Sequence, residues 1–458
     1  MDFTYNNTAL WNLLVQLGMV AAILLLANVL RRKIPFIKKA LMPTAVLAGF
    51  LALFLRLSNI LRIDTVLMEM ITYHTIAIGF IALSLIIPKR QGNYSKAFVG
   101  SKTGALIVST YLIQGIIGLG VSIGLSYTIR PGLFKAAGLL LPMGFGQGPG
   151  QANNVGSTYE AMGFAGGQSF GLSIAAMGFL VACIVGVIYL NILKKKGIGR
   201  KSSDPIGQEL ASIAEFEDKN EIPVAESVDR FSVQLALVLL VYLATWLAST
   251  GITKLLLASK SGFIISLIPL IWGFNFILGS LFAVSVRGIM RVFRNYKWMT
   301  HQYQNNYLLA RIAGYSFDLM IVTGICTINI EKLAGLWLPF ILMCVIGTVV
   351  TLFYLQWFCK RIYPDYYYEG FLSLFGMLTG VISSGILLLR EVDPKYETPA
   401  ANNLVLGSSF AIGFGFPVLI LIGMAPRSDL MALVTVGILT AYMVLLWVYM
   451  IAVKPKKT

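Results

Sequence analysis

The sequence predicts an all-α polytopic membrane protein, built from two inverted five-helix repeats and one extra C-terminal helix. Hydrophobic residues make up 57% of the 458 residues, and charged residues only 12%. A soluble chain of ordinary composition carries roughly a quarter charged residues. Two glycine-rich breaks, one in each half of the chain, favour the repeat, because paired interruptions of apolar segments are typical of membrane carriers.

Runs of about 20 apolar residues are long enough to cross the hydrocarbon core of a bilayer. We expect eleven such spans in this chain. They lie near 9–30, 41–57, 67–88, 103–127 and 169–192 in the first half, near 231–249, 263–286, 306–328, 334–356 and 402–424 in the second half, and near 430–453 at the end.

The formal net charge of +16 arises largely from Lys and Arg in short loops between apolar runs. This is the pattern of a topology signal rather than of a nucleic-acid interface, so we expect no nucleic-acid partner. Basic clusters follow the first, third and fifth spans, which places the N-terminus outside and the C-terminus inside. Residues 287–305 mix Arg and Lys with apolar residues and predict a short amphipathic helix on anionic headgroups.

The two halves of the chain correspond in the order of their features. The first spans begin at 9 and 231, and the glycine breaks begin at 144 and 376. Five spans are an odd number, so the second half enters the membrane from the opposite side, as in an inverted repeat. We therefore divide the chain into a first repeat (1–192), a cytoplasmic linker (193–230), a second repeat (231–424), and an extra transmembrane helix with a basic tail (425–458).

Each repeat is expected to contain a re-entrant hairpin, near 134–168 and near 368–392. Irregular backbone inside a membrane survives only where protein buries it or water reaches it. Gly148, Pro149 and Gly150 would break any helix, and Gly376, Gly380 and Gly385 allow close packing or exposed backbone. The alternative for the second segment is a complete span in which the glycines serve helix packing only.

The two hairpins predict a site for a small anionic or zwitterionic solute. Helix N-termini at such breaks bind carboxylates, and freed carbonyl groups hold Na⁺. Arg390 is the first candidate for a carboxylate ligand, and the alternative is a topology signal paired with Glu391 or Asp393. The candidate substrate-binding residues are Gly146, Gln147, Gly148, Gly150, Gln151, Asn153, Asn154, Thr379, Gly380, Ser383, Ser384, Gly385 and Arg390.

Polar and ionisable residues inside apolar spans are functional candidates, because each is costly in hydrocarbon. Asp318 is either a cation ligand or the counter-charge to Arg311, and the Asn pairs either bind ligand or cap helix starts. The candidate ion-binding residues are Ser157, Thr158, Glu160, Asp318, Asn402 and Asn403, with Na⁺ on an unassigned subset of them.

The second break resembles a re-entrant region of the bacterial sodium/glutamate symporter family. The resemblance rests on residues 375–380 and 387–394, which read Phe375-Gly376-Met377-Leu378-Thr379-Gly380 and Leu387-Leu388-Leu389-Arg390-Glu391-Val392-Asp393-Pro394. It implies hairpins that meet near the centre, Na⁺-coupled uptake of glutamate or a related amino acid, and a place in the bacterial cytoplasmic membrane. The first hairpin lacks the His-containing glycine motif of the better-known glutamate carriers, and the eleventh span is an addition.

Two other readings stay open at this point. Proton coupling would have to run through Asp318, Glu160 or His74. A membrane-embedded transferase would need clustered carboxylates or histidines near one face, and the two histidines lie far apart in sequence. We expect no enzymatic activity and no cofactor beyond the coupling ion, with the lipid bilayer, the solute and a second copy of the chain as partners.

Overall fold

The computed structural model describes residues 8–87, 94–196, 230–258, 268–273, 275–299, 301–393 and 398–452. These residues are almost entirely helical, without any strand, and ten of their helices are long and apolar enough to cross a membrane. The predicted all-α polytopic membrane protein is thereby confirmed. Most of the predicted linker (197–229) and the basic tail (453–458) lie outside the described residues.

The chain forms two compact units. Unit 1 comprises Met1–Glu69, Gln91–Lys201 and Ile321–Thr458, and unit 2 comprises Met70–Arg90 and Ser202–Met320. Two of the boundaries fall inside helices, α4 (Thr65–Leu85) and α12 (Asn306–Cys326), so each of these helices contributes residues to both units.

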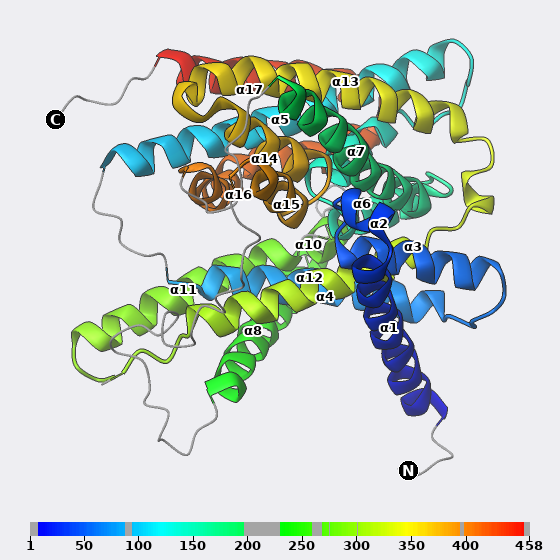
Figure 1. Ribbon diagram of the computed structural model, residues 1–458. Coiled ribbons are helices and arrows are strands. Elements are labelled where there is room, and N and C mark those ends of the chain that lie inside the picture. Colours follow the sequence, from blue (N-terminus) through cyan, green and yellow to red (C-terminus); the bar gives the residue numbers. More distant parts are fainter. Residues whose placement is uncertain are drawn as a thin grey trace. The chain divides into compact units, whose positions relative to one another are not determined.

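Unit 1 is organised around α5, a helix that is buried on most sides along its middle. A helix that is uncharged and mostly apolar on every side, as α5 is between 103 and 125, is suited to such a central position. Helices α13, α16 and α17 pack along it, and α13 and α17 can be followed beside α5 in Figure 1. The long helices of this unit are α1 (Thr8–Lys33), α5 (Tyr94–Tyr127), α7 (Gly167–Lys195), α13 (Trp337–Ile362), α16 (Ala400–Met424) and α17 (Asp429–Ala452).

Two helical hairpins also belong to unit 1. Hairpin 1 consists of a 3₁₀ turn, η1 (Lys135–Leu139), a π-helical turn, η2 (Pro142–Gly146), and helix α6 (Pro149–Ala161). Hairpin 2 consists of α14 (Tyr367–Thr379) and α15 (Ile382–Val392), which lie side by side in Figure 1. We call residues 147–148 the tip of hairpin 1 and residues 380–381 the tip of hairpin 2.

The arms of hairpin 2 approach so closely that only glycine fits between them. A Cβ atom on Gly376 would lie 2.8 Å from the Cα of Gly385, and a Cβ on Gly385 would overlap the carbonyl oxygen of Ser373. Small residues at such contacts let two helix backbones meet inside a membrane. The three glycines of the predicted second hairpin therefore serve both its packing and its break.

Unit 2 is built from α8 (Arg230–Ala258), α10 (Ile268–Gly273), α11 (Asn275–Asn295) and the parts of α4 and α12 that belong to it. Its core brings together apolar residues of four helices. These include Ile81, Val238, Val241, Ala283 and Leu309.

Two details differ from the sequence-based expectation. The predicted span 41–57 forms α3 (Thr44–Leu57), whose 14 residues reach about 21 Å. The chain turns before it, where Leu41 has a positive φ of 53° and Pro43 caps the helix. The amphipathic helix predicted at 287–305 is wrong: α11 runs without interruption to Asn295, and its basic residues form the last turns of that one helix.

Candidate functional site

The tips of the two hairpins lie against each other. Gly148, the residue before α6, has a φ of 86° and a ψ of −173°, a conformation open essentially to glycine alone. A Cβ atom on Gly148 would lie 3.2 Å from Cγ1 of Val381 and 3.8 Å from the carbonyl oxygen of Gly380. Two breaks that are far apart in the sequence therefore meet at one place in unit 1.

Two helix N-termini begin at this meeting point. Helix α6 starts with Pro149 directly after Gly148, and α15 starts directly after the extended residue Val381. The first N–H groups of a helix have no partner within it, and neither glycine nor valine has a side-chain oxygen that could cap them. Each N-terminus also carries the positive end of the helix dipole. The tips thus present two sets of backbone donors suited to an anion.

The third residue of each of these helices is a buried polar side chain without a partner. Gln151 of α6 is 0% exposed, and Ser384 of α15 is 3% exposed. Within the described part of the chain, both amide atoms of Gln151 and the hydroxyl of Ser384 lack a hydrogen-bond partner. Buried polar groups are almost always paired, so unpaired ones at a helix start indicate a place for a ligand or water.

Gln114 in the middle of α5 links the tips to the helices behind them. Its Nε2 donates to the carbonyl oxygen of Leu378 and to Oγ1 of Thr351, each at 3.0 Å. Its Oε1 has no partner among the described residues, and it would lie 3.1 Å from a Cβ atom on Gly146. Gln114 therefore contacts both hairpins from one position.

Helix α7 closes the other side of this meeting point. A Cβ atom on Gly178 would overlap the carbonyl oxygen of Thr379 and would lie 3.0 Å from Cδ1 of Phe145. Thr379 turns its hydroxyl back to the carbonyl oxygen of Phe375, at 2.7 Å, within its own helix. The predicted residue Thr379 is thus at the tip, with its backbone rather than its hydroxyl turned toward α7.

The tips contain no charged side chain. From Pro142 to Tyr159 and from Phe371 to Leu389, the sequence has no Asp, Glu, Lys, Arg or His. Any electrostatic attraction for a solute at the tips therefore comes from backbone and amide dipoles.

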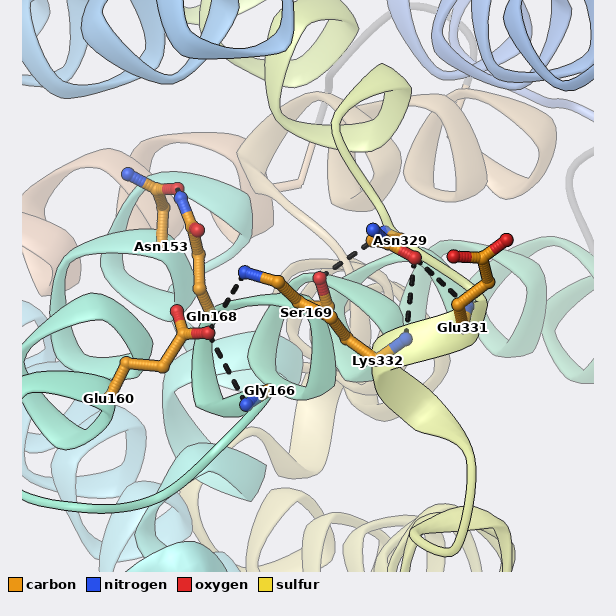
Figure 2. A network of polar contacts seen from close by, with 8 residues as sticks. All are labelled: Asn153, Glu160, Gly166, Gln168, Ser169, Asn329, Glu331 and Lys332. Carbon is orange, nitrogen blue, oxygen red and sulfur yellow. Dashed lines mark hydrogen bonds and ion pairs between the residues drawn. The ribbon is translucent and has the colours of Figure 1, made fainter.

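Two predicted residues, Asn153 near the start of α6 and Glu160 near its end, belong to a polar network shown in Figure 2. Asn153 Oδ1 accepts a hydrogen bond from Gln168 Nε2 at 2.8 Å. Glu160, at the end of α6, accepts hydrogen bonds from Lys332 Nζ at 3.1 Å and from the backbone N–H of Gly166 at 3.3 Å. The Glu160 carboxylate is thus part of an ion pair that ties hairpin 1 to the loop before α13.

The remaining candidates on unit 1 are not gathered at the tips. Asn403 donates from Nδ2 to the hydroxyl of Tyr366, at 2.7 Å, near the start of α16. Thr158 donates to the carbonyl oxygen of Asn154 at 2.8 Å, and Ser157 and Asn402 are half-buried on their own helices. Thr158 thus bonds to a backbone carbonyl of its own helix, and Asn403 ties the start of α16 to the turn before α14.

The structure does not bring Arg390 to the tips. It is exposed on the last turns of α15, eight residues after the start of that helix, or about 12 Å along its axis. Ser383, which precedes the buried Ser384, is exposed as well.

The ionisable candidates Asp318 and His74 belong to unit 2. Asp318 is exposed on α12. Arg311, its expected partner, lies instead over the ring of Tyr307, with its Cζ 4.9 Å from the ring centroid. The Nδ1 of His74 is hydrogen-bonded to the hydroxyl of Tyr242 at 2.5 Å.

Two residues at the tips escaped sequence analysis, Gln114 and Gly178. Gln114 carries a detectable signal, because an amide in the middle of an apolar span must find a partner inside the membrane. Gly178 carries no such signal in the sequence, because α7 contains other glycines and only the fold shows which of them contacts the hairpins. Comparison of the chain with protein-family models and with curated proteins finds no match.

Proposed function

We propose that the chain is a secondary active transporter that binds a small anionic or zwitterionic solute between the two hairpin tips. The observation that carries this proposal is the meeting of two uncapped helix N-termini beside the buried, unpartnered side chains of Gln151 and Ser384. A carboxylate there would accept hydrogen bonds from backbone N–H groups and from the amide and hydroxyl of these side chains.

The coupling ion in this proposal is Na⁺. Hard oxygen atoms are available at the tips, from the Gly380 carbonyl, the Ser384 hydroxyl and Oε1 of Gln151. Unwound carbonyl groups of this kind coordinate Na⁺ in carriers with broken helices. The resemblance to sodium/glutamate symporters makes glutamate the first solute to test, and a bacterial cytoplasmic membrane with the N-terminus outside is the setting that it and the loop charges favour.

Uptake of radiolabelled L-glutamate into proteoliposomes, with and without an inward Na⁺ gradient, tests the proposal. We expect accumulation that depends on the gradient and that falls by at least tenfold in Gln151→Met and Ser384→Ala. Ser409→Ala is the matched control, because Ser409 is exposed on α16 and, among the described residues, bonds to the carbonyl oxygen of Val405 in its own helix.

The outcomes separate the parts of the proposal. If glutamate is not taken up but another carboxylate or amino acid is, the site stands and the solute changes. Uptake that follows a pH gradient instead of the Na⁺ gradient would replace sodium by proton coupling. Equal uptake by Gln151→Met and the unmodified protein, for every solute transported, would remove the tips as the site.

A further inference from the structure

Unit 2 carries a second polar feature, a cleft at the basic end of α11. The cleft is partly open to solvent, and all of its lining residues belong to unit 2. Its polar lining consists of Arg287, Arg291, Arg294, His301, Gln302 and Gln304. This cleft plays no part in the proposed solute site of unit 1.

The three arginines of the cleft lie on one face of α11, at spacings of four and three residues. Arg287 Nη1 donates to the carbonyl oxygens of Ser84 and Ile86, at 3.0 and 2.7 Å, and Arg294 Nη1 donates to Oε1 of Gln302 at 2.9 Å. A guanidinium has five N–H groups, so these bonds orient Arg287 and Arg294 and leave further donors for a ligand.

In the part of the chain that the structure describes, no acidic side chain lines the cleft to balance these charges. Among the described residues of unit 2, Asp318 is the one acidic residue, and it is not part of the cleft lining. Three like charges held around one cavity repel one another, and a bound anion would relieve that repulsion.

Gln304 gives an independent indication of a ligand. It lines the cleft, is 3% exposed, and its Nε2 has no hydrogen-bond partner in the described structure. A buried amide donor without an acceptor is destabilising, so its place in the cleft points to an acceptor atom that a ligand supplies.

We propose that the arginine cleft binds a phosphate group, supplied by the headgroup of an anionic phospholipid. Arginine and a buried amide donor suit the oxygens of a phosphate. The apolar part of the lining, with Met290, Met299 and Tyr303, suits the glycerol and the first acyl carbons. Basic pockets on the cytoplasmic side of membrane helices bind such headgroups.

Native mass spectrometry of the purified full-length protein tests this site, with phosphatidylglycerol and phosphatidylcholine added in turn. We expect phosphatidylglycerol to bind in preference, and Arg291→Gln to weaken its binding roughly fivefold, the effect of one basic residue near an anionic lipid. Lys297→Gln is the matched control: it removes one exposed positive charge near the same helix end but does not line the cleft.

A second variant separates binding from folding. Gln304→Met removes the unpartnered amide but keeps the volume, so the protein without lipid should melt at the same or a higher temperature while phosphatidylglycerol binding falls. Thermal shifts with glycerol 3-phosphate and inorganic pyrophosphate identify the source of the phosphate. Stabilisation by these soluble probes that Arg291→Gln abolishes would assign the cleft to free phosphates as well as to lipid.

The proposal is overturned if phosphatidylglycerol and phosphatidylcholine bind equally. It is also overturned if Arg291→Gln and Lys297→Gln weaken binding by the same factor, because the attraction would then be a general surface charge effect rather than a site.

Discussion

Replacing Gly148 by alanine should disrupt the contact between the tips of the two hairpins. The φ of 86° and ψ of −173° at this residue cost a side-chain-bearing residue about 1–3 kcal/mol. The added Cβ would also lie 3.2 Å from Cγ1 of Val381. Because Val381 is only half-buried and its side chain can shift by a few tenths of an ångström, we expect the backbone to account for most of the loss.

An energy of this size reduces the population of the correct tip geometry roughly five- to 150-fold. We therefore expect Gly148→Ala to lower solute uptake by at least fivefold and to lower the melting temperature of the purified protein. Both are measured on the same preparation, by proteoliposome uptake and by thermal unfolding in detergent.

Gly163→Ala is the control that separates strain from function. Gly163 also has a positive φ, 103°, but a Cβ there would meet nothing within 4 Å. It should lose stability through its backbone while retaining uptake, since it follows α6 at the end away from the tips. A Gly148→Ala protein that melts and transports like the unmodified chain would refute the reasoning, as would recovery of full activity on adding Val381→Ala, which would make crowding the main cause.

Three further predictions concern other parts of the chain. Hydrogen bonds from the first turn of α4 and from a side-chain amide hold the pKa of Asp64 below its ordinary 3.8. The ionised Asp64 carboxylate therefore stabilises the fold above that pH, and this stabilisation is lost as the pH falls. Asp64→Asn should remove this acid dependence of the melting temperature. The hydrogen-bonded ion pair with Asp429 raises the pKa of Lys135 above its ordinary 10.5. The stabilisation that the protonated Lys135 gives is therefore complete below pH 10.5 and is lost as the pH rises through the raised pKa. Because the Asp429 side of the pair is exposed, Lys135→Met should lower the melting temperature in dilute buffer but not in about 1 M salt. Gly178→Ala should reduce uptake by pushing α7 away from the carbonyl at the tip of hairpin 2, whereas Gly120→Ala, with nothing within 4 Å of its Cβ, should transport normally.

The hydropathy pattern and the positions of glycine and proline predicted most of the helices and the breaks between them. The apolar runs are long enough that their helices follow from composition and length, and residues such as Gly148 and Pro149 exclude a continuous helix. One error occurred where charge was taken as the end of a span. Arg287, Arg291 and Arg294 lower the local hydropathy, but arginine side chains can reach the interface from the last turns of a helix, so α11 continues through them.

The candidate site could be located in the sequence but not assembled from it. The two breaks identified the tips, and Gln151 and Ser384 follow them in register at the third position of each helix. The sequence does not say which end of a short helix meets the partner hairpin, so Glu160 and Arg390 appeared as near to the site as Gln151. Gln114 reaches the tips only through the packing of α5, which depends on contacts between distant parts of the chain.

The lack of charged side chains at the tips has an electrical consequence. In the proposed carrier, the empty binding site would cross the membrane field without a net side-chain charge of its own, so voltage should hardly affect the return of the empty protein. Over a complete cycle, the net charge moved per molecule of solute equals the charge of the solute plus that of its coupling ions. A ratio of charge to solute flux, measured on a solid-supported membrane, would count the Na⁺ ions directly.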